Sequence, residues 1–219
     1  MSTEQQSAGA IKTYVIGTDH VHTQRSLEIQ HNDQPILWAV KYFGDFHRPE
    51  IRITTNGEEG PTLAAMSFKS MRGIRVMLGD DPDALPKEAW ADVDPEGMTS
   101  GQHTFVFDDR PFWWKRRVQS IREKLELHVI DPLIRTHNKQ YGASSLGGRD
   151  FKLIDGDEQV LAVYINDSRT FNVEDIGRID YFVELGRELE LFTLAAILGI
   201  QERIRRQRRN NAGGGAGAM

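Results

Sequence analysis

The feature that most constrains this chain is an apolar stretch near its C-terminal end, LELFTLAAILGI at residues 189–200, in which Glu190 is the only charge. A helix that spans a membrane needs about 20 apolar residues, so this stretch is too short. Its apolar side chains would point in every direction around a helix, whereas a surface helix shows one stripe. We therefore expect a helix buried on all sides. The residues expected to be buried in it are Leu189, Leu191, Phe192, Leu194, Ala195, Ile197, Leu198 and Ile200.

Upstream of this stretch, short segments of strand character follow one another with turn signals between them. The Asn56-Gly57 pair is the strongest hairpin signal among these turns. Strands at such spacing indicate a sandwich or a barrel. The expected strands are residues 12–16, 26–30, 36–43, 50–55, 63–68, 74–78, 103–107, 112–115, 151–154, 160–165 and 178–184.

The buried helix decides between these two architectures. A sandwich has no room for a helix that is apolar on every side, whereas a closed barrel of about ten to twelve strands has that room. We therefore predict a mainly β protein, a closed antiparallel barrel that encloses a hydrophobic C-terminal α-helix. The barrel domain is expected at residues 12–209, after a flexible N-terminus at 1–11 and before a disordered glycine-rich tail at 210–219.

Two internal segments do not fit the strand pattern. Residues 80–102 are acidic and rich in proline and glycine, so we expect an exposed loop. Residues 118–148 are expected to be an insertion or loop. Its first part, 118–134, has apolar residues at helical spacing and could form a short helix or remain a loop.

Composition limits the classes of function. The net charge of −5 argues against bulk, sequence-independent binding of nucleic acid, which requires cations that neutralise phosphates. The chain has no cysteine, which excludes disulfides, thiol nucleophiles and cysteine-ligated metals. The first ten residues, MSTEQQSAGA, show no secretory signal. We expect a cytoplasmic protein, with a nuclear or peripheral-membrane location as the alternatives.

Patterns that carry catalysis or bind metals are weak in this sequence. His20 and His22 form only a pair, and a dedicated metal site needs three or four ligands. Residues 92–97 resemble the start of a calcium loop, but His103 stands where the bidentate Glu belongs. Residues 142–148 are glycine-rich without a phosphate-loop ending, and no G-x-S-x-G occurs. We therefore assign no catalytic, cofactor or metal-binding residue.

Two basic segments are candidates for binding an anionic partner. In a strand, Trp113, Lys115 and Arg117 would share one face, and such an aromatic and cationic patch suits anionic lipid headgroups. The alternative is a barrel wall whose cations reach past the apolar surface into water. The run at 203–209 could bind lipid, act as a nuclear localisation signal or cap the helix. Its candidate lipid-binding residues are Arg205, Arg206, Arg208 and Arg209.

The closing part of the chain resembles the tubby C-terminal-like superfamily, which includes the LURP-one-related proteins and the phospholipid scramblases. The likeness is carried by DFKLIDGDEQVLAVYIN and by FNVEDIGRIDYFVELGRELELFTLAAILGIQERI, within residues 150–204. HNDQPILWAVKY and TNGEEGPTLAAMSF look like the early hairpins of that superfamily. The resemblance implies a barrel of about 12 strands around a central C-terminal helix, and binding of phosphoinositides. The segments above are fewer, which leaves either an unrecognised strand or a departure from the family.

The chain also departs from animal scramblases. It lacks their cysteine clusters and their proline-rich N-terminal segment. At the position of their calcium motif it has Glu174, Asp175, Asp180 and Glu184, with Arg178 between them, so the spacing of the motif is lost. Scramblase activity is therefore not carried over from the resemblance.

These observations favour a non-catalytic binding or adaptor protein that contacts anionic phospholipid headgroups, such as those of phosphoinositides. Phospholipid scramblase-like lipid transfer is the first alternative. A hydrolase with dispersed catalytic residues is the second. The sequence identifies no protein partner and gives no specific signal for nucleic acid.

Overall fold

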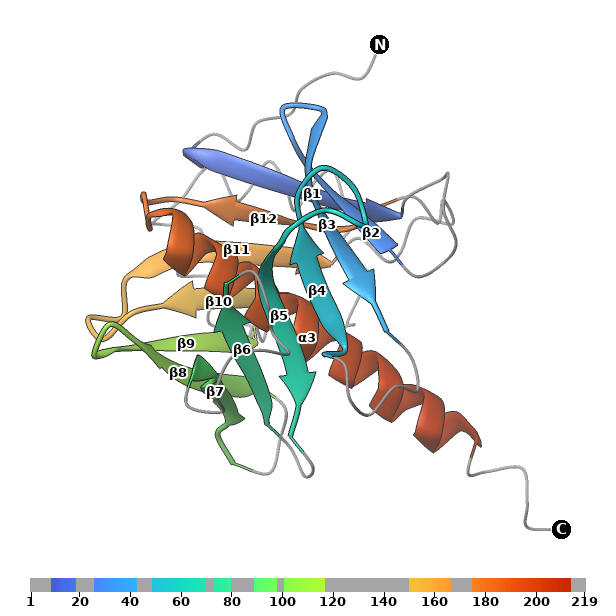
Figure 1. Ribbon diagram of the computed structural model, residues 1–219. Coiled ribbons are helices and arrows are strands. Elements are labelled where there is room, and N and C mark those ends of the chain that lie inside the picture. The colour runs from blue at the N-terminus through green and yellow to red at the C-terminus, as the bar shows by residue number, and fades with distance from the viewer. Residues whose placement is uncertain are drawn as a thin grey trace, which may run out of the picture.

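A computed structural model describes residues 9–18, 26–42, 49–69, 73–79, 89–97, 101–116, 150–166 and 175–213. These residues form a closed antiparallel barrel of 12 strands around one C-terminal helix, which confirms the predicted fold class (Figure 1). The helix is α3 (Arg187–Gly213). The strands are β1 (Lys12–Thr18), β2 (Ser26–His31), β3 (Gln34–Lys41), β4 (Ile51–Thr54), β5 (Thr62–Phe68), β6 (Ile74–Leu78), β7 (Ala91–Pro95), β8 (Gln102–Phe107), β9 (Arg110–Arg116), β10 (Phe151–Ile154), β11 (Val160–Asn166) and β12 (Asp175–Tyr181).

Each strand pairs with the next strand along the chain, and β1 pairs with β12 to close the barrel. The tight turns have the residues that left-handed backbone favours. Asn56 and Gly57 both have positive φ at the turn between β4 and β5, so the predicted hairpin is confirmed. Asn32 and Asp33 also have positive φ, at the turn between β2 and β3.

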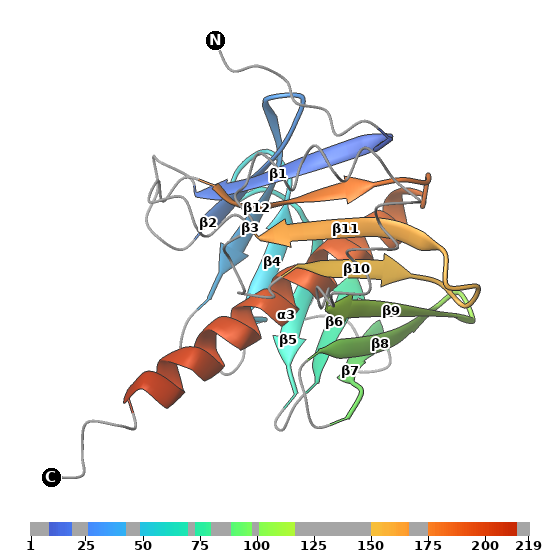
Figure 2. The same cartoon turned by 180° about the vertical axis from the view of Figure 1, so that it is seen from behind.

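The apolar stretch of α3 lies inside the barrel, as predicted. Every residue from 192 to 200 is buried, as is Leu189, while Leu191 is half-buried and packs against the same core. Beyond these residues α3 continues out of the barrel and projects past the strands (Figures 1 and 2). In the described part of the chain, no helix combines the length and apolarity needed to cross a bilayer.

The helix lies off-centre in the barrel, closest to β5 and β6. On that side Gly199 allows close approach, since a Cβ atom there would lie 2.8 Å from Met66 Cγ and 2.9 Å from Ile74 Cδ1. On the other side, large aromatic side chains fill the wider gap between helix and wall. They come from β8 to β12 and are Phe105, Phe112, Trp114, Phe151, Tyr164 and Tyr181.

Several strand ends differ from the prediction by up to three residues, and two segments differ in kind. Strand β7 lies within residues 80–102, which we expected to be a loop, because Val93 faces the core while Asp92 and Asp94 both pair with Lys69. Helix α3 continues past Arg209 to Gly213, so the start of the predicted tail is helical. Extending an existing helix costs far less than nucleating one, which explains the additional turn. Residues 1–8, 117–149 and 214–219 lie outside the described residues.

Replacing Gly199 with Val should destabilise the barrel, because the new side chain would meet Met66 and Ile74. We expect a loss of about 1–3 kcal/mol in the free energy of unfolding, as for other overpacked cores. Met66→Ala alone should also lower the free energy of unfolding. The double variant should lose less than the sum of the two single losses, because alanine at position 66 leaves room for valine at position 199. Urea denaturation of the four proteins measures this coupling, and simple additivity would contradict the close packing.

Candidate functional site

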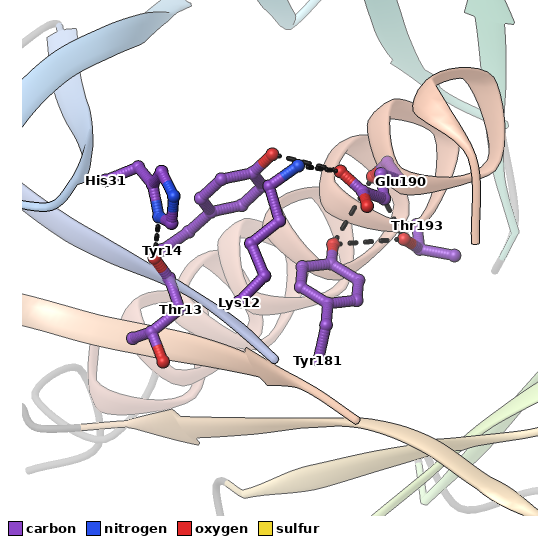
Figure 3. Close-up of polar contacts among 7 residues, drawn as sticks. All are labelled: Lys12, Thr13, Tyr14, His31, Tyr181, Glu190 and Thr193. Atoms are coloured by element: carbon purple, nitrogen blue, oxygen red, sulfur yellow. Dashed lines mark hydrogen bonds and ion pairs between the residues drawn. The ribbon is translucent and has the colours of Figure 1, made fainter. Parts of the chain in front are cut away.

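A polar cluster surrounds Glu190 at the start of α3, where the helix enters the barrel (Figure 3). The Glu190 carboxylate forms an ion pair with Lys12, whose Nζ lies 2.6 Å from Oε2. The Tyr14 hydroxyl donates to the same oxygen at 3.0 Å. Both partners come from β1, so the one charge in the apolar stretch ties α3 to the first strand.

The same cluster continues along the helix through neutral hydroxyl groups. Thr193 Oγ1 donates to the Glu190 carbonyl at 3.0 Å, and the Tyr181 hydroxyl lies 3.2 Å from Thr193 Oγ1. Burial, reinforced by the charge of Glu190, raises the pKa of Tyr14. Burial also raises the pKa of Tyr181. Both phenols therefore stay protonated and act as donors, which suits a clamp that holds the helix in register and not a general base.

Removing the Tyr14 hydroxyl should destabilise the protein more than removing the Tyr181 hydroxyl. Tyr14→Phe takes a hydrogen bond from a carboxylate, which should cost about 1.5–3 kcal/mol. Tyr181→Phe removes contacts between neutral groups, which should cost about 0.5–1.5 kcal/mol. Urea denaturation of both variants makes the comparison. An equal or reversed loss would mean that Glu190 does not organise the cluster.

A second cluster surrounds Glu202, where α3 leaves the barrel. Its carboxylate is buried, and Arg205 holds it with two hydrogen bonds of 2.8 and 2.6 Å. Arg206 Nε donates to Glu202 Oε1 at 3.0 Å, and Lys41 Nζ lies 3.7 Å from Oε2. Three cations thus meet one carboxylate, and we call these four residues the exit cluster. It carries a positive net charge.

The charged groups of the exit cluster shift one another's pKa values. Burial acts to raise the pKa of Glu202, but the hydrogen bonds from Arg205 and Arg206 and the charge of Lys41 outweigh it, so the pKa lies below its usual value. Burial lowers the pKa of Lys41, although Glu202 opposes this. Glu202 therefore remains the negative centre around which the cations gather.

More cations extend this positive end of the molecule. Arg203 Nη1 donates to the Gly73 carbonyl at 2.5 Å. The guanidinium groups of Arg203 and Arg206 lie over the Phe68 ring, 5.9 and 4.6 Å from its centroid. Arg208 is exposed on the projecting turns. These arginines therefore surround the mouth from which α3 emerges.

The structure separates the predicted lipid-binding residues into two groups. Arg205 and Arg206 belong to the exit cluster, and Arg208 follows it on α3. The other group lies on β9, well away from the projecting end of α3 in both views (Figures 1 and 2). The side chains of Arg117 and Arg209 lie outside the described residues.

On β9 the predicted alternation is confirmed, since Trp114 and Phe112 are buried while Trp113 and Lys115 are half-exposed. Acidic side chains already lie against this outer face. Trp113 Nε1 donates to Glu96 Oε1 at 2.9 Å, and Lys115 Nζ lies 4.0 Å from Glu158. The β9 patch therefore has fewer described cations than the end of α3, and acidic side chains lie against it.

The remaining metal-site candidates are only partly within the described residues. His20 and His22 lie outside the described residues. Asp180, from the degraded calcium motif, pairs with Arg178 at 3.1 Å and accepts a hydrogen bond from Thr13. Among the described residues, no group of three or more His, Asp or Glu side chains could hold a metal ion.

Comparison with known proteins assigns no family to the chain. No family model matches the chain, and neither a curated protein nor a solved structure is significantly similar to it.

The exit cluster should make stability depend on pH. The pKa of Glu202 is lower in the folded protein than its unfolded value of about 4.3, so the stability that it provides is present above that pH and is lost as the pH falls through the folded pKa. Glu202→Gln leaves the surrounding cations without their carboxylate. The variant should be less stable than the parent near neutral pH, and the gap should narrow on acidification.

Urea-unfolding free energies measured across the acid range test this expectation. Glu188→Gln, at an exposed position in the first turn of the same helix, is the matched control, and its loss of stability should be smaller than that of Glu202→Gln. A gap for Glu202→Gln that stays constant or widens towards acid would contradict the assigned charge state.

Proposed function

We propose that this chain is a non-catalytic binding or adaptor protein that docks on anionic phospholipid headgroups through the projecting end of α3. The observation that carries the proposal is the positive charge at the exit mouth. Arg203, Arg205, Arg206 and Arg208 follow one another on a helix that leaves the barrel, and Glu202, which binds Arg205 and Arg206, is buried beneath them. Cations clustered in this way are attracted to the negative surface of a membrane.

The distribution of charge favours docking in one orientation. The whole chain has a net charge of −5, while the end of α3 is strongly positive. An anionic surface would therefore attract this end and repel much of the remaining molecule. The projecting turns also extend beyond the barrel wall, so they can reach the surface first (Figure 1).

The resemblance to the tubby C-terminal-like superfamily supports the same proposal. It implied both a barrel around a C-terminal helix and binding of phosphoinositides, and the fold agrees with the first expectation. The β9 patch at Trp113 and Lys115 is a secondary contact in this proposal, because acidic neighbours lie against it. Lipid transfer and hydrolysis stay as untested predictions.

Co-sedimentation with vesicles tests the proposal. The full chain should bind vesicles that contain a phosphoinositide more tightly than vesicles of phosphatidylcholine alone, and added salt should weaken the binding. Arg208→Glu should weaken it about tenfold, since each basic residue near such a surface contributes about 1 kcal/mol and the variant adds repulsion.

Arg110→Glu is the matched control. It makes the same change of charge at an exposed position on β9, away from α3. Its binding should stay close to that of the parent protein. Equal binding to neutral and anionic vesicles, or an equal loss in both variants, would refute docking through α3.

A further inference from the structure

Two buried nitrogen atoms inside the barrel lack the hydrogen-bond partners that such atoms normally have. They are His103 Nδ1 and Trp114 Nε1. The other buried atoms without a partner in the described residues are Nε atoms of arginines, namely Arg52, Arg75 and Arg178. Each of these arginines makes other contacts through its side chain. The His103 and Trp114 nitrogens therefore stand apart.

The register of the barrel places these two residues together. His103 on β8 lies directly opposite Trp114 on β9, and residues so paired have Cβ atoms about 4.5–5.5 Å apart. Trp114 is 0% exposed and His103 is 3% exposed, so both face the core. The Phe151 ring lies beside His103, with 6.3 Å between ring centroids. The two residues are therefore neighbours on the inner side of the wall, and both nitrogens are enclosed.

One cation of α3, Arg203, lies close enough to act on His103. Burial and, secondarily, the positive charge of Arg203 lower the pKa of His103 to about 4, so the imidazole is neutral at neutral pH. A neutral imidazole can hold its one proton on Nδ1, and the indole nitrogen can only donate. Two donors from neighbouring residues and one nearby cation, Arg203, therefore lie in this part of the core.

A buried donor without an acceptor destabilises a protein, and Phe at position 114 would fill similar space without that penalty. An oxygen that carries negative charge would accept from both nitrogens. We propose that His103 Nδ1 and Trp114 Nε1 bind one oxygen of a small carboxylate or phosphate ion inside the barrel, with Arg203 supplying the compensating positive charge.

This site is distinct from the docking surface proposed above. It lies behind the wall, so a headgroup that remains in a bilayer does not reach it. The ligand is therefore a free small anion. Binding of this anion can be confirmed or refuted independently of membrane docking.

Nuclear magnetic resonance of the indole N–H groups tests the proposal on the full chain. The protein has four tryptophans, Trp38, Trp90, Trp113 and Trp114, and single Trp→Phe variants assign their signals. Inorganic phosphate and acetate, each titrated at constant ionic strength against a chloride control, should shift the Trp114 signal to saturation with at least one of them. Vesicles containing a phosphoinositide should leave that signal in place.

Two variants test whether the shift of the Trp114 signal reports anion binding at this site. His103→Phe should weaken the apparent affinity about tenfold or more, because one hydrogen bond to a charged group is lost. Trp38→Phe is the control, since Trp38 lies half-buried on β3 between the inward-facing Leu37 and Ala39. It should leave the affinity unchanged.

Thermal unfolding provides a second measurement that needs no assignment. The anion that shifts the Trp114 signal should raise the Tm of the parent and of Trp38→Phe, but not that of Trp114→Phe. A Trp114 signal that moves with neither ion, that moves equally with chloride as an adventitious ion only, or that keeps its affinity in His103→Phe would overturn the proposal.

Discussion

The fold depends on one constraint, which is that a helix with apolar side chains on every side must be shielded on every side. The barrel meets this demand because its strands form a continuous wall with no free edge around α3. The helix lies closer to one side of the barrel wall than to the other. Gly199 brings the helix against β5 and β6, and the aromatic side chains of β8 to β12 fill the wider space opposite. Side-chain size, varied around the wall, thus sets where the helix lies.

Polar contacts at the two ends of the buried segment fix the position of α3 along its axis, which apolar packing alone does not. Apolar contacts alone allow a helix to slide or rotate, since they are not directional. Glu190 binds Lys12 and Tyr14 at one end, and Glu202 binds Lys41 at the other. A slip of one turn would separate Glu190 from Lys12 and Tyr14, and Glu202 from Lys41, at a high cost in free energy. The two glutamates therefore fix the helix along its axis.

The sequence predicted the barrel, the buried helix and most strands, because these follow from local patterns and from the length of the apolar run. It missed β7, whose ADVDP sequence has one inward apolar residue, since that strand is held by its neighbours and by Lys69. It named Arg205 and Arg206 as candidates for binding lipid or capping the helix, without recognising Glu202 as their partner. Their pairing with Glu202 fits helical spacing, but the burial of that carboxylate beside Lys41 is a contact across the fold. Distant contacts of this kind leave no local signal.

The order of strands in the wall also governs how the molecule can be made. Translation produces β1 first and delivers its second neighbour, β12, only shortly before α3. A growing sheet on the ribosome therefore exposes an unpaired β1 edge and an unfilled apolar interior until β12 and α3 have been made. Open edges and exposed apolar surface both promote aggregation. Closure of the barrel is consequently a late step in synthesis, because it needs β12 and α3 to be present together with β1.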